Sequence, residues 1–148
     1  MLKRIILLLI LTLAITGCEF NKEIKKFSLN DNYYNNYTGF ITAKSDTLPK
    51  KESYILYTYN NYCNLAISCD LIFTSFMEKY NISFVSIPFE EFKKTNYYKT
   101  VKYAPSIIVI KKGKIVTYLD ADNDEDLDKY QDVTAFETWL EKYIYFEK

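Results

Sequence analysis

The sequence predicts an α/β domain with a central mixed sheet, and three observations carry this prediction. Residues 54–59 have the composition of a buried strand, a helical pattern then runs to Tyr80, and a second buried strand follows at 82–87. A two-stranded hairpin comes next, and an amphipathic helix closes the chain. Parallel strands followed by an antiparallel hairpin give a mixed sheet, and the helices are left to cover its faces.

The composition is that of one compact domain. The chain has 148 residues, of which 49% are hydrophobic, with 15 Tyr and 10 Phe. Large aromatic side chains bury much area, so we expect a sizeable core. Only 3 Gly and 3 Pro are present, which argues against repeats and against a long flexible linker.

Charge and residue types exclude several classes of function. The net charge is zero, and a chain beginning at Cys18 has 17 basic and 19 acidic side chains, a net charge of −2. This balance and the absence of a recognition motif argue against a nucleic acid partner. The chain has no His, which excludes a catalytic imidazole or a Cys/His zinc site, and three Cys are too few for a four-thiolate site. We therefore expect no metal and no cofactor.

The first 18 residues have the parts of an export signal. Lys3 and Arg4 precede an apolar run at 5–15, which is shorter than the ~20 residues that span a bilayer. Ile15-Thr16-Gly17-Cys18 resembles the bacterial lipobox, in which a small residue precedes a cysteine that receives diacylglycerol before cleavage. The resemblance implies an acylated Cys18, palmitate included, that anchors the chain in membrane lipid on the extracytoplasmic side of the cell membrane. A plain signal peptide with an accidental cysteine and an uncleaved anchor helix are the alternatives.

These patterns divide the chain into three parts. Residues 1–17 are the predicted lipoprotein signal peptide, and the polar stretch 18–36 is a predicted tether. Residues 37–148 are the predicted domain, with an edge strand expected within 37–43.

The elements of the domain follow from hydrophobic spacing. The helix that ends at Tyr80 carries Ile72 and Phe76 on one apolar stripe. Only Asn81 separates it from the strand at 82–87, so the two flanking strands are parallel and joined by a right-handed crossover.

The later elements are a helix at 90–99, a hairpin and a final helix. Residues 107–110 and 115–119 form the hairpin, with Gly113 supplying a positive φ in its turn. Thr134-Ala-Phe-Glu137 predicts a capping box that opens the final helix. Its expected buried stripe contains Phe136, Leu140, Tyr143 and Ile144.

The order of these elements and several residues resemble the thioredoxin-like superfamily. Tyr62-Cys63 followed by a helix resembles the family's active-site corner, and Ala104-Pro105 with the strand and Gly turn after it resembles the cis-proline strand. The resemblance covers roughly residues 54–145. It implies a thioredoxin-like three-layer α/β/α sandwich, a cis peptide at Pro105, and a substrate groove at Ala104 and Pro105 that faces the cysteines.

Cys63 and Cys69 are the candidate catalytic residues. Members that exchange disulfides carry Cys-x-x-Cys, whereas here the pair is Cys-x5-Cys. A disulfide needs Cα atoms within ~7 Å, and six residues of helix rise ~9 Å. The pair can therefore bridge only if the helix begins near Ser68, a suitable N-cap. The helix N-terminus then favours a thiolate at Cys69.

Two residues oppose this activation, and three interpretations stay open. The charge of Asp70 disfavours a neighbouring thiolate, and Tyr57 stands where the resemblance places a buried acid. The pair either exchanges disulfides with exported protein thiols, with Cys63 attacking and Cys69 resolving, or forms a structural disulfide or idle pair on a non-catalytic binding module. A metal role is the third interpretation.

The alternating acids of Asp120–Asp128 resemble a calcium loop. The run lacks Gly at the sixth position, where Glu125 stands, and Glu at the twelfth, where Gln131 stands. We favour a solvated acidic loop ahead of the final helix, with weak calcium binding outside the cell as the alternative.

Overall fold

The computed structural model describes residues 25–60 and 68–147, and within them five strands form one mixed sheet in the order β1-β3-β2-β4-β5. The strands are β1 (Ile41–Thr42), β2 (Tyr54–Tyr59), β3 (Val85–Pro88), β4 (Ser106–Lys111) and β5 (Lys114–Asp120). The helices are α2 (Cys69–Tyr80), α3 (Phe89–Phe92) and α4 (Val133–Leu140), with 3-10 turns η1 (Asp31–Tyr33), η2 (Asn96–Lys99) and η3 (Asp124–Tyr130).

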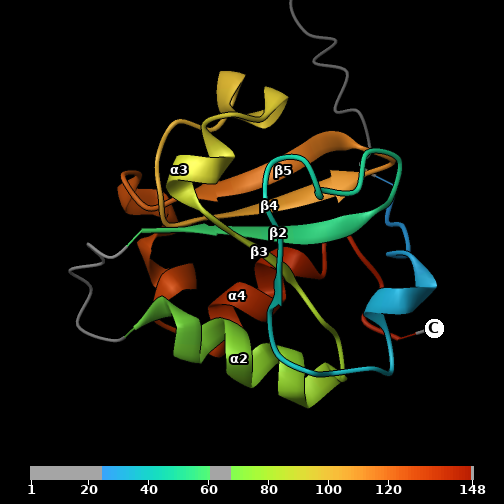
Figure 1. Ribbon diagram of the computed structural model, residues 1–148. Coiled ribbons are helices and arrows are strands. Elements are labelled where there is room, and N and C mark those ends of the chain that lie inside the picture. The colour runs from blue at the N-terminus through green and yellow to red at the C-terminus, as the bar shows by residue number, and fades with distance from the viewer. Residues whose placement is uncertain (1–24, 61–67, 148) are drawn as a thin grey trace, which may run out of the picture.

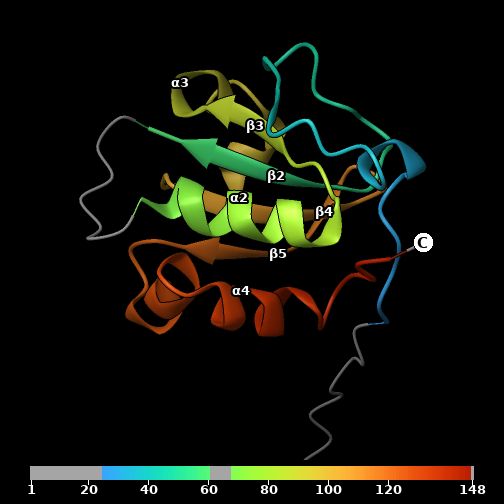
Figure 2. The ribbon, with the colours of Figure 1, turned by 90° about the horizontal axis from the view of Figure 1, so that it is seen from below.

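The sheet lies between two layers of helix. β1, β3 and β2 are parallel, whereas β4 is antiparallel to β2 and β5 is antiparallel to β4. Helices α2 and α4 cover one face of the sheet and α3 lies on the other (Figure 1). Figure 2 shows α2 running along the central strands, with α4 beside it near β5. This is the thioredoxin-like three-layer α/β/α sandwich that the sequence predicts.

β2 has the predicted boundaries, and β4 extends one residue beyond the predicted 107–110 at each end. β3 begins at Val85 and not at residue 82 as predicted, because Ile82 pairs with Tyr34 and the Ser83 N–H donates to the Tyr33 carbonyl.

β2 and β4 are buried on both faces. β2 pairs with β3 on one side and with β4 on the other, and its residues from Tyr54 to Tyr57 are at most 4% exposed. Residues Ile107–Ile110 of β4 are fully buried. Continuous apolar runs of this kind are typical of strands covered on both faces.

Helix α2 begins directly after Ser68, as the cysteine spacing requires for a bridge. It ends at Tyr80, where Asn81 adopts a left-handed conformation with φ of 52° and closes the last turn. The helix buries Ile72, Phe73, Phe76 and Met77.

The predicted hairpin turn at Gly113 is confirmed. Lys112 and Gly113 have φ of 49° and 75°, the positive values that a two-residue type I′ turn requires at both central positions. The Gly113 N–H donates to the Glu52 carbonyl at 2.9 Å, which ties the turn to the chain ahead of β2.

The predicted helix at 90–99 is wrong. The chain instead forms the short α3, a turn, and η2, because Thr95 is extended and its hydroxyl donates to the Phe92 carbonyl at 2.8 Å. Tyr97 then reaches across the sheet end, with its hydroxyl 3.5 Å from that of Tyr54 and 3.3 Å from the Gly113 carbonyl. A continuous helix over 90–99 would not place the Tyr97 hydroxyl beside these two groups.

The predicted start and end of the last helix also need correction. Asp132, not Thr134, is the N-cap of α4, since its carboxylate accepts from the Ala135 N–H at 2.7 Å. The helix ends at Leu140, so Tyr143 and Ile144 lie beyond it. Ile144 is still fully buried, where it pairs with Phe27.

The described part of the predicted tether, residues 25–36, belongs to the folded domain. Phe27, Leu29 and Tyr33 are at most 8% exposed. The Phe27 N–H donates to the Tyr143 carbonyl, and the Phe27 carbonyl accepts from the Tyr145 N–H, both at 3.0 Å. The domain therefore begins before residue 37. The signal peptide, the lipobox and Cys18 lie outside the described residues. Among the helices of residues 25–60 and 68–147, none is long and apolar enough to cross a membrane.

Buried tyrosines predict a loss of stability in alkali. Burial first of all raises the pKa of Tyr57 and of Tyr130 well above the usual value of 10.0. The unfolded chain releases these phenolic protons above pH 10 while the fold retains them, so stability is full below pH 10 and falls above it. Each retained proton lowers the free energy of unfolding by about 1.4 kcal/mol per pH unit.

Urea unfolding between pH 8 and 12 measures this fall. In the Tyr130→Phe variant the free energy of unfolding should fall less steeply with pH, by about 1.4 kcal/mol per pH unit, the contribution of one retained proton. A variant slope equal to that of the wild type contradicts the assignment to Tyr130.

Candidate functional site

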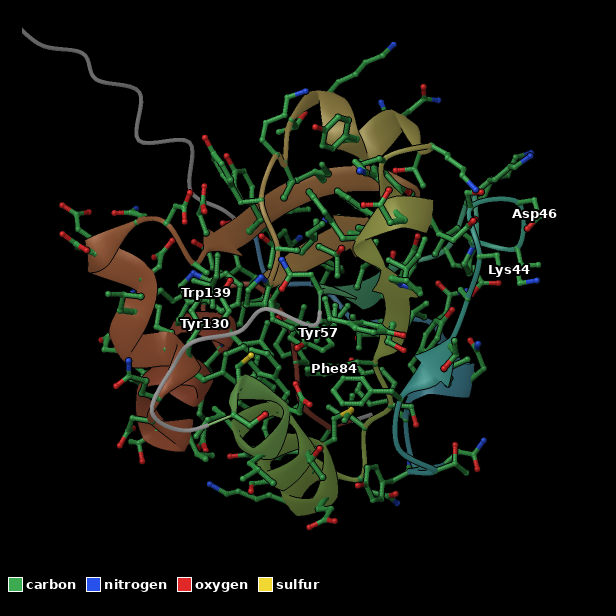
Figure 3. All side chains as sticks on the ribbon, turned by 60° about the vertical axis from the view of Figure 1, so that its left-hand side comes forward. Lys44, Asp46, Tyr57, Phe84, Tyr130 and Trp139 are labelled. Atoms are coloured by element: carbon green, nitrogen blue, oxygen red, sulfur yellow. The ribbon has the colours of Figure 1, made fainter. Side chains whose placement is uncertain are left out.

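The start of α2 brings together the two residues that the sequence marks as opposing activation of the cysteines. Cys69 is the first residue of the helix and is fully buried. Its sulfur lies 3.5 Å from the Tyr57 hydroxyl and 4.0 Å from Oδ1 of Asp70. Tyr57 lies in the interior between the sheet and α2 (Figure 3), and its hydroxyl donates to Asp70 Oδ1 at 2.8 Å.

These contacts suit a protonated thiol at Cys69. A phenol has one proton to donate, and the proton of Tyr57 is directed at Asp70. The thiol of Cys69 can then donate its proton to Asp70 Oδ1 or to the Tyr57 oxygen.

Tyr57 cannot replace the buried acid of the thioredoxin-like pattern as a base. Desolvation first, and then the contacts with Cys69 and Asp70, raise its pKa far above the usual range. The side chain stays a neutral phenol across the physiological range, so its role at this site is to donate or accept a hydrogen bond.

The loop before β4 is the second structural part of the site. The Ala104–Pro105 peptide bond is cis, as the resemblance implies. Asn60, which follows β2, donates its amide proton to the Ala104 carbonyl at 3.0 Å. The Tyr130 hydroxyl lies 3.1 Å from the Pro105 carbonyl and 2.8 Å from the Leu119 carbonyl. Polar side chains from two separate segments thus hold the cis-proline loop.

Aromatic packing connects this loop to the cysteine. The Tyr130 ring contacts the Phe73 ring with centroids 5.9 Å apart, and Phe73 contacts Tyr57 at 5.2 Å. Cys63, the other predicted catalytic residue, lies outside the described residues, as does the rest of 61–67.

An open cleft of about 540 Å³ lies at the carboxyl ends of β1, β3 and β2. Its lining is mostly polar and comprises Phe40, Thr42, Tyr57, Tyr59, Asn60, Ser68, Asp70 and Ser86. Ala104 and Pro105, the predicted groove residues, are not among them. Asn60 connects the two features, because it lines the cleft and donates to Ala104. Ligand sites of open α/β sheets commonly lie at this edge.

Sequence reasoning missed Asn60 and Tyr130. The position of Asn60 directly after a buried strand was the available signal for it. Tyr130 lies among acidic residues, and no spacing in the sequence points from there to Pro105.

In the acidic run Asp120–Asp128, carboxylate side chains accept hydrogen bonds from backbone N–H groups of the same run. Asp126 accepts from the Asp120 N–H and Asp120 accepts from the Asp122 N–H, both at 3.0 Å. Lys129 lies 2.8 Å from Asp128 and 3.7 Å from Asp126. Within residues 25–60 and 68–147, no group of three His, Cys, Asp or Glu side chains could hold a metal ion. The run leads through η3 into α4, as an acidic segment ahead of the final helix.

Fold and site together define a thioredoxin-like α/β sandwich with a buried cysteine at the start of α2. No protein-family model matches the sequence, and no curated protein matches it.

Proposed function

We propose that this protein is a membrane-anchored, extracytoplasmic thioredoxin-like lipoprotein that exchanges thiols and disulfides through Cys63 and Cys69. The observation that carries the proposal is the position of Cys69, whose buried sulfur stands at the first residue of α2. A buried cysteine there suits the resolving role, because burial keeps its sulfur from substrates.

In the proposed reaction the Cys63 thiolate attacks one sulfur of a disulfide in an exported protein. The substrate S–S bond breaks, a mixed disulfide forms, and one substrate thiolate leaves. The Cys69 thiolate then attacks the Cys63 sulfur and releases the second substrate thiolate. The substrate gains two electrons and the two protons that the cysteine pair loses. A dithiol of another protein restores the pair, and the reverse sequence oxidises a substrate dithiol.

Tyr57 can support the second step through its hydrogen bond. When Cys69 loses its proton, the Tyr57 hydroxyl can turn from Asp70 to the sulfur, which lies 3.5 Å away. A hydrogen bond to the charged form favours that form. The rotation costs the Tyr57–Asp70 bond, so we expect resolution to be slow.

Asp70 favours a second candidate, a non-catalytic thioredoxin-like binding module with a structural disulfide or idle cysteines. Its carboxylate oxygen lies 4.0 Å from the Cys69 sulfur. At that separation two like charges repel by about 1 kcal/mol in water and about 4 kcal/mol near a protein surface. In this candidate the cleft beside Asp70 binds a segment of the partner.

Redox titration of the Cys63/Cys69 couple in glutathione buffers separates the two candidates. Exchange predicts turnover of a model disulfide, and it predicts a trapped mixed disulfide at Cys63 in the Cys69→Ser variant. A potential well below ~−300 mV without turnover marks a structural bridge and rejects the exchange mechanism.

A separate measurement tests the anchor. Labelled palmitate should enter the wild-type chain and not the Cys18→Ala variant. Equal incorporation in both rejects acylation at Cys18.

A further inference from the structure

Lysines gather at the end of the sheet that lies opposite Cys69. β4 ends at Lys111, which pairs in register with Lys114 at the start of β5, and Lys112 stands in the turn between them. Lys50 and Lys51 lie against this turn, since a Cβ built on Gly113 would come within 2.0 Å of the Lys50 carbonyl oxygen. We call these five residues, with Lys25, the lysine face.

The described chain also starts at this end. The Lys111 ammonium lies 4.7 Å from the centroid of the Phe27 ring, and the Asn30 N–H donates to the Ser53 carbonyl at 2.9 Å. Cys18 precedes Lys25 by seven residues, a stretch of at most about 25 Å in any conformation. A lipid on Cys18 therefore keeps this end of the domain close to the bilayer.

The lysine face carries positive charge that the described residues do not neutralise. None of its six ammonium groups makes an ion pair with a carboxylate of the described chain. All except Lys111 are exposed. The nearby acid Glu52 accepts a hydrogen bond from Tyr33 at 2.7 Å, and Glu141 pairs with Lys26. The local charge is thus positive although the chain from Cys18 has a net charge of −2.

The candidate site lies at the other end of the same strands. Thr58 near the end of β2 pairs with Ser106 at the start of β4, and Ser106 pairs with Asp120 at the end of β5. A strand of six residues is about 20 Å long. The strands therefore separate the lysine face from Pro105 and the start of α2. Figure 1 shows the start of α2 and the turn between β4 and β5 at opposite ends of the sheet.

We propose that the lysine face rests on the anionic headgroups of the membrane lipids, so that the Cys69–Pro105 end points away from the bilayer. The proposal rests on the proposed acylation of Cys18. Each lysine near an anionic surface strengthens membrane binding by about fivefold. The attraction falls off within about 8 Å at physiological salt. A short tether and a basic surface at its exit together fix one orientation, which neither feature fixes alone.

The test is amine labelling of the full acylated chain on vesicles of phosphatidylcholine alone or mixed with phosphatidylglycerol. A membrane-impermeant reagent modifies exposed lysines, and mass spectrometry reads the rate at each site. We expect Lys112 and Lys114 to react at least about threefold more slowly on the anionic vesicles. Lys93, after the helix α3 that follows the carboxyl end of β3, and Lys102, two residues before Ala104, should keep their rates. Equal protection of both pairs overturns the proposal.

A charge-matched pair of variants checks the cause. Lys112→Glu/Lys114→Glu should restore the solution labelling rates of Lys50 and Lys51 on anionic vesicles, whereas Lys93→Glu/Lys102→Glu should leave them protected. Protection that survives the first variant contradicts an electrostatic contact.

Flotation with pure phosphatidylcholine vesicles tests the anchor separately, because it depends on the acyl chains. A protein that does not float has no lipid anchor. One that floats without end-specific protection on anionic vesicles is anchored but not oriented by the lysine face.

Discussion

Replacing Phe76 by Ala is expected to lower the free energy of unfolding by about 3–5 kcal/mol. Phe76 is fully buried on α2. Its ring lies 5.1 Å from that of Phe136 in α4, 5.1 Å from Phe146 and 5.9 Å from Phe84. Truncation therefore leaves a cavity between α2, α4, the residues just before β3 and the C-terminal segment.

Leu71→Ala is the matched control, because Leu71 lies on the same helix and is 61% exposed. Its loss should change stability by no more than about 0.5 kcal/mol. Urea unfolding followed by the fluorescence of Trp139, the single Trp, measures both variants. Similar losses at the two positions contradict the assignment of Phe76 to the centre of the core.

Gly113→Ala is expected to cost at least about 3 kcal/mol, from backbone strain and a steric clash. Gly113 has φ of 75°, and an added Cβ would lie 2.0 Å from the Lys50 carbonyl oxygen. Because that oxygen belongs to the backbone, the turn itself must move. Such a movement also breaks the bond from the Gly113 N–H to Glu52.

Gly39→Ala separates the two causes. Gly39 has a similar φ of 89°, but nothing lies within 4 Å of an added Cβ. Its substitution should cost only the left-handed strain, about 1–2 kcal/mol. Equal losses in the two variants would show that the close approach to Lys50 adds nothing.

The sheet could be predicted because its central strands are continuous apolar runs, the pattern that is typical of strands covered on both faces. β2 and β4 are buried on both faces, so their sequences are continuous runs of Tyr, Ile, Leu and Val. The single residue between α2 and the strand region after it, and Gly113 in the hairpin, fixed the directions of these strands. Local sequence and tertiary structure agree at each of these points.

The errors fall where tertiary contacts override the local pattern. Phe27 lies in a polar, aperiodic stretch, and its backbone partners, Tyr143 and Tyr145, are at the far end of the chain. The helix predicted at 90–99 is interrupted at Thr95, whose hydroxyl bonds locally to the Phe92 carbonyl, and Tyr97 then bonds to Gly113 in the hairpin, a partner that local sequence does not reveal. At the start of α4, Asp132 and Thr134 are both able to cap, and the backbone uses the first.

The candidate site was predictable as a location and less so as chemistry. The alternation of β2 places Tyr57 on the face that meets α2, yet its bond to Asp70 depends on where the helix begins. Only the folded chain shows that these two residues act on one sulfur.

The pairing of Phe27 with Ile144 also determines when the domain can be completed. A chain synthesised from its N-terminus exposes Phe27 early, but Tyr143 and Tyr145, which hold it, emerge last. Until then the Phe27 backbone lacks the two groups that hold it, although Asn30 and Tyr33 of the same segment already have Ser53 and Ser83 as partners. Closing so large a loop costs only slightly more entropy than closing a shorter one. Phe27 is therefore among the first residues of the domain to be synthesised and among the last to reach its native position.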